Sequence, residues 1–276
     1  MEPVSLIILF VMGTLAGAIN AAVGSGSLLT LPVLLALGIP PGVSVRSNTV
    51  GILFSTIGSV VGYRREIAAE QKDLGPLMVV VAVTATLGSV LLLVSPSEAL
   101  DVVVPVLIVL ALVMVIFQKR ITGMVQAVGE RRAARRARRR RQTLEEAAAG
   151  ERSPYRSPGL LGAMGAASIY GGYFTAAQGI LYLGVLGATT GRSMGAVNSV
   201  KNLASLVVNL AAAIVYVIAY FALGAEIIWV ATAAIALGAL LGGYFGAHLA
   251  KKLPDAVLRG VIVVVALFAL VRQFTG

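Results

Sequence analysis

The sequence contains no cysteine, and it has a single histidine among its 276 residues. The lack of cysteine excludes disulfides, thiolate catalysis and cysteine metal sites, and we expect no cofactor. Charged residues make up only 12% of the chain, about half of the share that soluble domains carry. Because so few groups cannot form a cluster of catalytic side chains, we expect that the protein is not an enzyme.

Apolar residues dominate the sequence instead, with a hydrophobic share of 58% and a mean hydropathy of +0.92. A soluble domain of this size could not bury so much apolar surface. Ten apolar segments follow one another, and several have the roughly 20 residues needed to cross about 30 Å of hydrocarbon. We expect an all-α integral membrane protein with eight to ten transmembrane helices, formed by segments 4–23, 27–39, 48–63, 74–94, 102–118, 159–177, 179–188, 196–221, 227–250 and 256–274.

The ten segments fall into two related halves of five. In each half the order of lengths is long, short, long, long and long. A shift of 152 positions places Ser27, at the start of one short segment, on Gly179, and Asn48 falls on Asn198 after a small gap. We therefore divide the chain into a first transmembrane repeat (1–118), an arginine-rich loop (119–157) and a second transmembrane repeat (158–276).

Nearly all of the net charge of +10 lies in the central loop. Between Lys119 and Arg156, 12 basic and four acidic residues give a net +8, and eight arginines fall between Arg131 and Arg141. Such a stretch is typical of the cytoplasmic side of a membrane protein and attracts anionic lipid headgroups. We prefer this interpretation to the binding of nucleic acid or protein, and expect lipid but no nucleic acid as a partner. The sequence is also compatible with a homo-oligomer.

The loops predict opposite orientations for the two halves. The loop after the third segment is basic in the first half (64–72), whereas its counterpart (224–226) has no basic residue. The loops after the fourth segments reverse this, with acidic residues at 98–101 and basic residues at 251–259. Because basic flanks mark the cytoplasm, we predict two inverted repeats in the cell membrane, with an odd number of crossings each and both termini outside.

Two of the segments, 27–39 and 179–188, are too short to cross the membrane at 1.5 Å per residue. Each follows a polar, glycine-bearing joint, with the sequences NAAVGSGS (20–27) and YGGYFTAAQG (170–179). Unwound backbone at membrane depth must be satisfied by protein or water, and broken helices that meet near the midplane form substrate sites in many secondary transporters. The alternative is that these small residues only permit close helix packing. The candidate binding residues in the joints are Asn20, Gly24, Ser25, Gly26 and Gln178.

The third segment of the second half has a polar stripe. Its members are spaced by four, three and four residues and so share one helix face: Asn198, Asn202, Ser205 and Asn209. Lys201 lies beside this stripe and is the only basic residue well inside a long segment. An intramembrane charge indicates a functional site, here a contact with substrate. The alternative is that Lys201 snorkels to the cytoplasmic interface.

Three segments of the chain resemble the sulfite exporter TauE/SafE family of anion permeases. They are GAINAAVGSGSLLTLPVLLALGIPP (17–41) and RSNTVG (46–51) in the first half, and GAVNSVKNLASLVVN (195–209) in the second. The resemblance extends over nearly the whole chain through the order of segments. It implies two repeated halves and transport of sulfite, sulfoacetate or other sulfur-containing and organic anions across the cytoplasmic membrane. The joint YFTAAQG (173–179) departs from the glycine-rich family pattern.

The resemblance also implies site roles for individual residues. In the first half these are Asn20, Gly24, Gly26, Asn48 and Thr49, and in the second half Asn198, Lys201 and Asn202. Amide N–H groups and an ammonium group are suitable donors to the oxygens of an anion. The predicted function is therefore a permease or exporter that moves small anions by alternating access around a midplane site. An inside-negative potential drives such anions outward by about 2.3 kcal/mol per charge at 100 mV.

A transporter of a neutral or cationic solute is the alternative function, and it predicts an acidic residue in the cavity. The sequence leaves the anion, the coupling ion and the oligomeric state open. Three further basic residues lie near predicted membrane surfaces. Arg46 and Arg192 either gather anions at the cavity mouths or anchor the interface, and His248 is interpreted as an interfacial residue and not as a proton relay.

Overall fold

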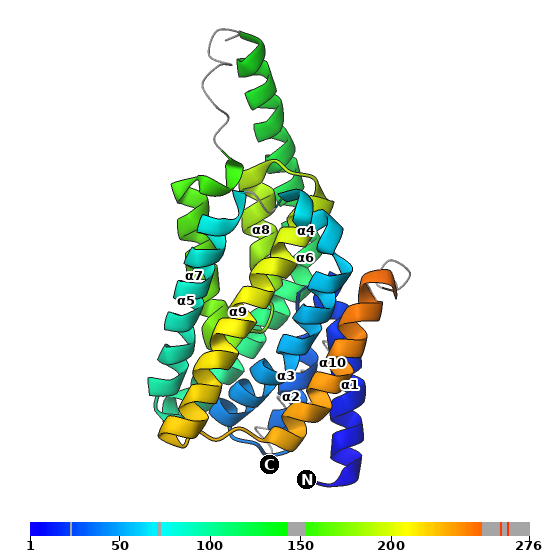
Figure 1. Ribbon diagram of the computed structural model, residues 1–276, viewed down its shortest axis with the longest axis vertical. Helices are drawn as coiled ribbons and strands as arrows, with labels where there is room; N and C mark the ends of the chain where they lie inside the picture. The colour runs from blue at the N-terminus through cyan, green and yellow to red at the C-terminus, as the bar shows by residue number, and fades with distance from the viewer. Residues whose placement is uncertain (23, 71–72, 143–152, 250–259, 261–263, 265–276) are drawn as a thin grey trace.

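The computed structural model describes all residues except 23, 71–72, 143–152, 250–259, 261–263 and 265–276. The described part of the chain is helical and contains no strand (Figure 1). The first half forms α1 (Pro3–Ala22), α2 (Ser27–Ala36), α3 (Pro41–Gly62), α4 (Arg64–Glu70), α5 (Gly75–Val94) and α6 (Ser97–Gln142). After the 3₁₀ helix η3 (Pro154–Arg156), the second half forms α7 (Pro158–Phe174), α8 (Gln178–Thr190), α9 (Met194–Leu223) and α10 (Trp229–Leu249).

Five of the described helices contain a stretch long and apolar enough to cross a membrane. These stretches are Pro3–Ala22, Gly75–Val94, Ser97–Gln118, Met194–Leu223 and Trp229–Gly246. Helix α3 has 22 residues, but its many buried serine, threonine and asparagine side chains lower its hydropathy. The predicted all-α integral membrane class is therefore confirmed, and the chain is a multi-pass membrane protein.

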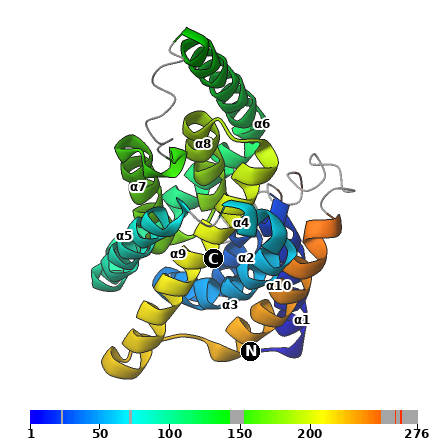
Figure 2. The same ribbon diagram turned by 45° about the horizontal axis from the view of Figure 1, so that its top comes forward.

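Most predicted segments match a helix within a few residues, and two differ for identifiable reasons. Helix α3 begins at Pro41 and not at position 48. Its first two turns carry the polar residues Ser44, Arg46 and Ser47, so they are not apolar enough to be predicted as part of a membrane segment. Helix α6 does not end near position 118 but continues through the arginines to Gln142, since alanine, arginine and glutamate are strong helix formers. This extension projects beyond the bundle (Figures 1 and 2). The predicted segment 256–274 lies outside the described residues.

The helix directions are consistent with inverted repeats. Helix α1 packs along α10 in a parallel sense, since Gly13 lies against Ile235 and Ala18 against Gly246. Helix α7 packs along α5 in the same way. Exchange of the two halves converts the first pair into the second, because α1 and α7 open the halves while α5 and α10 correspond to the fourth segment of each half. Figure 1 shows that α1 and α7 start at opposite ends of the bundle.

The two ends of the bundle differ in charge. At the end where α6 projects lie α4, with exposed Arg64 and Arg65, and the connection that carries Arg192 (Figure 1). We call this the arginine end. The opposite end, the acidic end, carries the start of α6 with Asp101 and the connection between α9 and α10 with Glu226. This distribution follows the loop charges from which the orientation was predicted.

Glycines bring α1 and α10 into backbone contact. A Cβ atom added at Gly17 would collide with the backbone of Ala239 and Gly243, and one added at Gly242 would collide with the backbone of Thr14. In a membrane, where apolar burial gives helices little preference for one another over lipid, such close approach is a main source of association. Close packing through glycines therefore holds α1 against α10.

We predict that Gly242→Ala lowers the stability of the folded protein by about 1–3 kcal/mol, because the added methyl overpacks the contact with Thr14. Thermal unfolding in detergent measures this as a lower Tm. Gly162→Ala on α7 is the matched control, since its Cβ would meet open space. Equal Tm values for the two variants would show that the α1–α10 contact does not hold the bundle together.

Candidate transport site

The joints before α2 and α8 are in direct contact. The backbone N–H of Gly179 donates to the carbonyl of Gly24 at 3.2 Å. Gly24 has a φ of 83°, and a Cβ there would collide with the Gly179 backbone, so glycine is required on both grounds. The predicted encounter of the two joints is therefore present in the structure.

The contact places both joints at depth in the membrane. Helices α1 and α2 form a hairpin from the acidic end, since α1 runs parallel to α10 and α2 leads into the start of α3 beside Glu226. Helices α7 and α8 form the opposite hairpin from the arginine end, and α8 leads to Arg192. In Figure 1, α2 accordingly lies in the lower part of the bundle and α8 in the upper part. Two turns that enter from opposite surfaces meet only inside the membrane.

The joint before α8 contains two residues with positive φ angles, a backbone conformation that residues other than glycine rarely adopt. Thr175 and Ala177 have φ values of 64° and 60°, which costs about 1–3 kcal/mol each for residues other than glycine. Hydrogen bonds hold this conformation in place: the hydroxyls of Thr49 and Thr175 lie 2.9 Å apart, and the Tyr170 hydroxyl donates to the carbonyl of Ala176 at 2.8 Å. The departure YFTAAQG from the glycine-rich pattern is thus compensated by local hydrogen bonds.

Lys201 binds the end of α1. Its Nζ donates to the carbonyls of Asn20 at 3.2 Å and Ala21 at 3.4 Å, and the Asn202 side-chain amide donates to Ala21 at 3.4 Å. The last carbonyls of a helix have no intrahelical partner and carry partial negative charge, so an ammonium group stabilises them. Lys201 is 0% exposed. The snorkelling alternative is therefore wrong.

The end of α7 is held in a similar way by another residue of α9. The Tyr216 hydroxyl donates to the carbonyl of Gly172 at 2.8 Å. The shift of 152 positions relates Gly172 to Asn20, whose carbonyl accepts from Lys201. Helix α9 therefore supplies a donor to each broken helix. Sequence reasoning missed Tyr216, although it lies seven residues after Asn209 and so continues the polar face of α9.

Side-chain hydrogen bonds connect each joint with the polar helices. The Asn20 amide donates to Ser55 on α3 at 2.7 Å, and the Gln178 amide donates to Asn209 on α9 at 3.2 Å. Thr30 of α2, also missed by sequence reasoning, donates to the side-chain oxygen of Asn48. These hydrogen bonds connect the joint before α2 with α3 and the joint before α8 with α9, and Thr30 adds a further contact to α3.

Six buried side-chain atoms on these helices and joints have no hydrogen-bond partner among the residues that the structure describes. They are Ser25 Oγ, Asn48 Nδ2, Gln178 Oε1, Asn198 Oδ1, Ser205 Oγ and Asn209 Nδ2. Buried polar atoms are almost always paired, so each such atom requires an explanation. The amide nitrogens and hydroxyls of this set are able to donate to a bound molecule. Gly26 has a packing role, since a Cβ there would collide with the carbonyl of Ala16.

Two arginines predicted near the cavity mouths lie at opposite ends of the bundle. Arg46 lines a pocket of about 350 Å³ at the acidic end, together with Pro40, Val43, Leu93 and Asp101. Arg192 pairs with Glu70 at the arginine end, at 3.4 Å. The side chain of the third basic residue, His248, is outside the described part of the structure.

Two broken-helix hairpins that meet inside a helical bundle are an arrangement found in many secondary transporters. The chain belongs to the sulfite exporter TauE/SafE family, whose model matches residues 9–272. This confirms the resemblance seen in the sequence motifs.

Similar proteins carry transporter names. The probable membrane transporter protein YfcA of Escherichia coli K12 is 23% identical over 96% of this chain and 88% of its own length. A probable membrane transporter protein of Haemophilus influenzae is 24% identical over 95% of this chain and 91% of its own length. The probable membrane transporter protein ORF9 of Sinorhizobium sp is 31% identical over 38% of this chain and 40% of its own length. No solved structure matches the chain significantly. The protein is therefore a membrane transporter.

We predict that Lys201→Met unfolds at a lower temperature than Lys201→Gln. Glutamine retains N–H donors for the carbonyls of Asn20 and Ala21, whereas methionine leaves these buried groups unpaired, which costs about 1–3 kcal/mol. Thermal unfolding of both variants in one detergent gives the comparison. If both unfold at the same temperature, the lysine does not stabilise the end of α1.

Proposed function

We propose that the protein transports small anions, of the sulfite or sulfonate type, by alternating access around the two joints. The observation that carries this proposal is the side chain of Lys201, whose amine is buried beside the joints with no buried carboxylate among the described residues. Among the described residues, Lys201 is the only charged side chain that is fully buried, and no aspartate or glutamate is. A site of this charge attracts anions and disfavours cations.

The donors of the region suit a tetrahedral or pyramidal oxyanion. Lys201 has three N–H groups and donates two hydrogen bonds to carbonyls, which leaves one for a substrate oxygen. Ser205 lies one helical turn after it, and its hydroxyl has no partner among the described residues and is able to donate. Asn198 lies one turn before it, and the unpaired atom of its side chain is the oxygen, which accepts and does not donate. Charge-assisted hydrogen bonds of this kind are about twice as strong as neutral ones. The predicted substrate contacts at Asn48, Thr49, Asn202 and the joint residues belong to the same proposal.

The proposal also includes the orientation of the protein and the membrane in which it lies. We assign the arginine end to the cytoplasm, following the rule that basic segments stay inside, and the α6 extension to the anionic headgroups of the cytoplasmic membrane. An inside-negative potential then favours anion efflux by about 2.3 kcal/mol per charge at 100 mV. In this proposal the protein is a transporter and not an enzyme.

Flux assays in proteoliposomes test this function. We predict transport of sulfite or sulfoacetate in a panel that also contains taurine, sulfate, lactate and thiosulfate. Lys201→Gln keeps donors for α1 but removes the charge, and we expect anion flux to fall by about 10–100-fold, from the loss of roughly 1.5–3 kcal/mol for a charged hydrogen bond. Lys201→Arg is the matched control, and it should retain part of the flux.

The alternative function makes the opposite prediction. Transport of zwitterionic taurine, or of a neutral solute, with no flux of any anion would contradict the proposal and support a transporter of neutral solutes. Unchanged anion flux in Lys201→Gln would remove Lys201 from the substrate site.

A further inference from the structure

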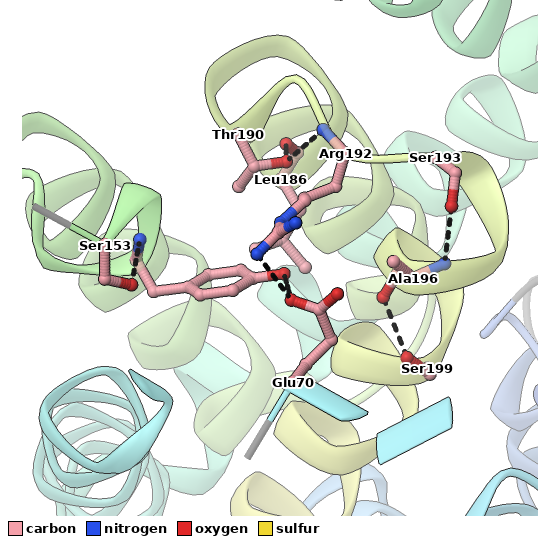
Figure 3. Close-up of polar contacts among 9 residues, drawn as sticks. Glu70, Ser153, Leu186, Thr190, Arg192, Ser193, Ala196 and Ser199 are labelled. Atoms are coloured by element: carbon pink, nitrogen blue, oxygen red, sulfur yellow. Dashed lines mark hydrogen bonds and ion pairs between the residues drawn. The ribbon is translucent and has the colours of Figure 1, made fainter. Parts of the chain in front are cut away.

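At the arginine end, an ion pair joins the two halves of the protein. The Glu70 carboxylate, on α4 of the first half, lies 3.4 Å from Arg192, in the connection between α8 and α9 of the second half. Figure 3 shows these side chains facing each other at the start of α9, where Ser193 caps the helix. The Tyr155 hydroxyl, on η3, donates to the same carboxylate oxygen at 2.9 Å. Three segments far apart in the sequence are thus tied at one point.

The carboxylate side of this contact is shielded from water, whereas the arginine is partly exposed. The Glu70 side chain is 11% exposed, while Arg192 is 46% exposed. Tyr155 is almost fully buried, and burial, reinforced by the hydrogen bond to Glu70 and its charge, raises the pKa of its hydroxyl. A phenol with a raised pKa stays protonated at physiological pH, so it remains a donor to the carboxylate. An ion pair in this setting is screened less than an exposed one.

The acidic end contains the corresponding arginine and glutamate from the opposite halves. Arg46 follows the short helix of the first half, as Arg192 follows that of the second. Glu226 lies between α9 and α10, as Glu70 lies between α3 and α5. The pair of Arg46 and Glu226 is therefore the approximate counterpart of the pair of Arg192 and Glu70, with Arg46 in the second turn of α3 and Arg192 two residues before α9 begins.

The two pairs are in different states. At the acidic end, Arg46 Nε donates to the backbone carbonyl of Glu226 at 3.0 Å, and among the described residues no ion pair joins the two side chains. The pocket of about 350 Å³ opens beside Arg46. At the arginine end, the carboxylate itself is bound by both Arg192 and Tyr155. One pair is engaged through its charges, and the other borders an open pocket.

We propose that these two pairs are the gates of the transporter, and that they close in alternation. The structure then has its inner gate closed by Glu70 and Arg192 and its outer vestibule open beside Arg46. In the opposite state the Glu226 carboxylate pairs with Arg46, the outer pocket closes, and the Glu70 pair separates. This inference rests on the proposed transport by alternating access, because two related gates serve no purpose in a protein with one conformation.

Cysteine labelling tests the gates directly, since the chain contains no cysteine of its own. Ser199→Cys reports on the inner side, because Ser199 is 0% exposed and lies in the second turn of α9, the helix against which α4 with Glu70 packs. Val43→Cys reports on the outer pocket that it lines. A membrane-impermeant maleimide is applied to intact cells for Val43→Cys and to inverted vesicles for Ser199→Cys. No substrate is needed, so the outcome is independent of which anion is transported.

We expect Glu70→Gln to raise the labelling rate of Ser199→Cys at least fivefold and to lower that of Val43→Cys. Glu226→Gln should leave Val43→Cys accessible and should not expose Ser199→Cys. The exchange Glu70→Arg with Arg192→Glu should restore the slow labelling of Ser199→Cys. Glu66→Gln, an exposed position one turn earlier on α4, is the matched control and should change neither rate.

Three outcomes would overturn the gates. They are no change of either rate in Glu70→Gln, an increase of both rates together, which indicates general loosening, and the same change in Glu66→Gln. Anion flux of the chain without substitutions is measured separately in proteoliposomes. Flux without the reciprocal labelling change defeats the gates alone, whereas the reciprocal change without anion flux defeats the proposed substrate alone.

Discussion

Two helices of this protein end inside the membrane, where hydrocarbon cannot hydrogen-bond to the carbonyls that a helix end exposes. Helix α9 resolves this constraint for both. Lys201 and Asn202 donate to the end of α1, and Tyr216 donates to the end of α7. Some backbone groups of the joints also bond to each other, since the N–H of Gly179 donates to the carbonyl of Gly24. The broken helices can therefore persist only as a packed set around α9.

The same interactions give the region its chemical character. One of the two side chains that donate to the end of α1 belongs to a basic residue, Lys201, which lies beside the place where the joints meet. Ser25 of the first joint and Ser205, one turn after Lys201 on α9, carry hydroxyls that have no partner among the described residues. The residue that holds the end of the broken helix is thus also the one that we propose contacts an anionic substrate, in a chain that belongs to the sulfite exporter TauE/SafE family.

Much of the architecture follows from the sequence because it depends on local composition. Helix α2 begins at Ser27 as predicted, and α8 begins one residue before the predicted Gly179. Tertiary contacts are harder to predict from the sequence. Lys201 bonds to carbonyls about 180 positions away, which its spacing on α9 does not reveal, and the pairing of Arg192 with Glu70 depends on how the halves pack. The polar residues at the start of α3 concealed its first turns for the same reason, since they face other helices and not lipid.

The most direct measurement of the central claim is a crystallographic determination with a bromine-labelled sulfonate, such as 2-bromoethanesulfonate, located by its anomalous scattering. The account predicts a bromine peak between the two joints, with the sulfonate oxygens within hydrogen-bonding distance of Lys201 Nζ and Ser205 Oγ. A bound sulfonate found only at the membrane surface or along the arginine-rich extension of α6, with none beside Lys201, would contradict it.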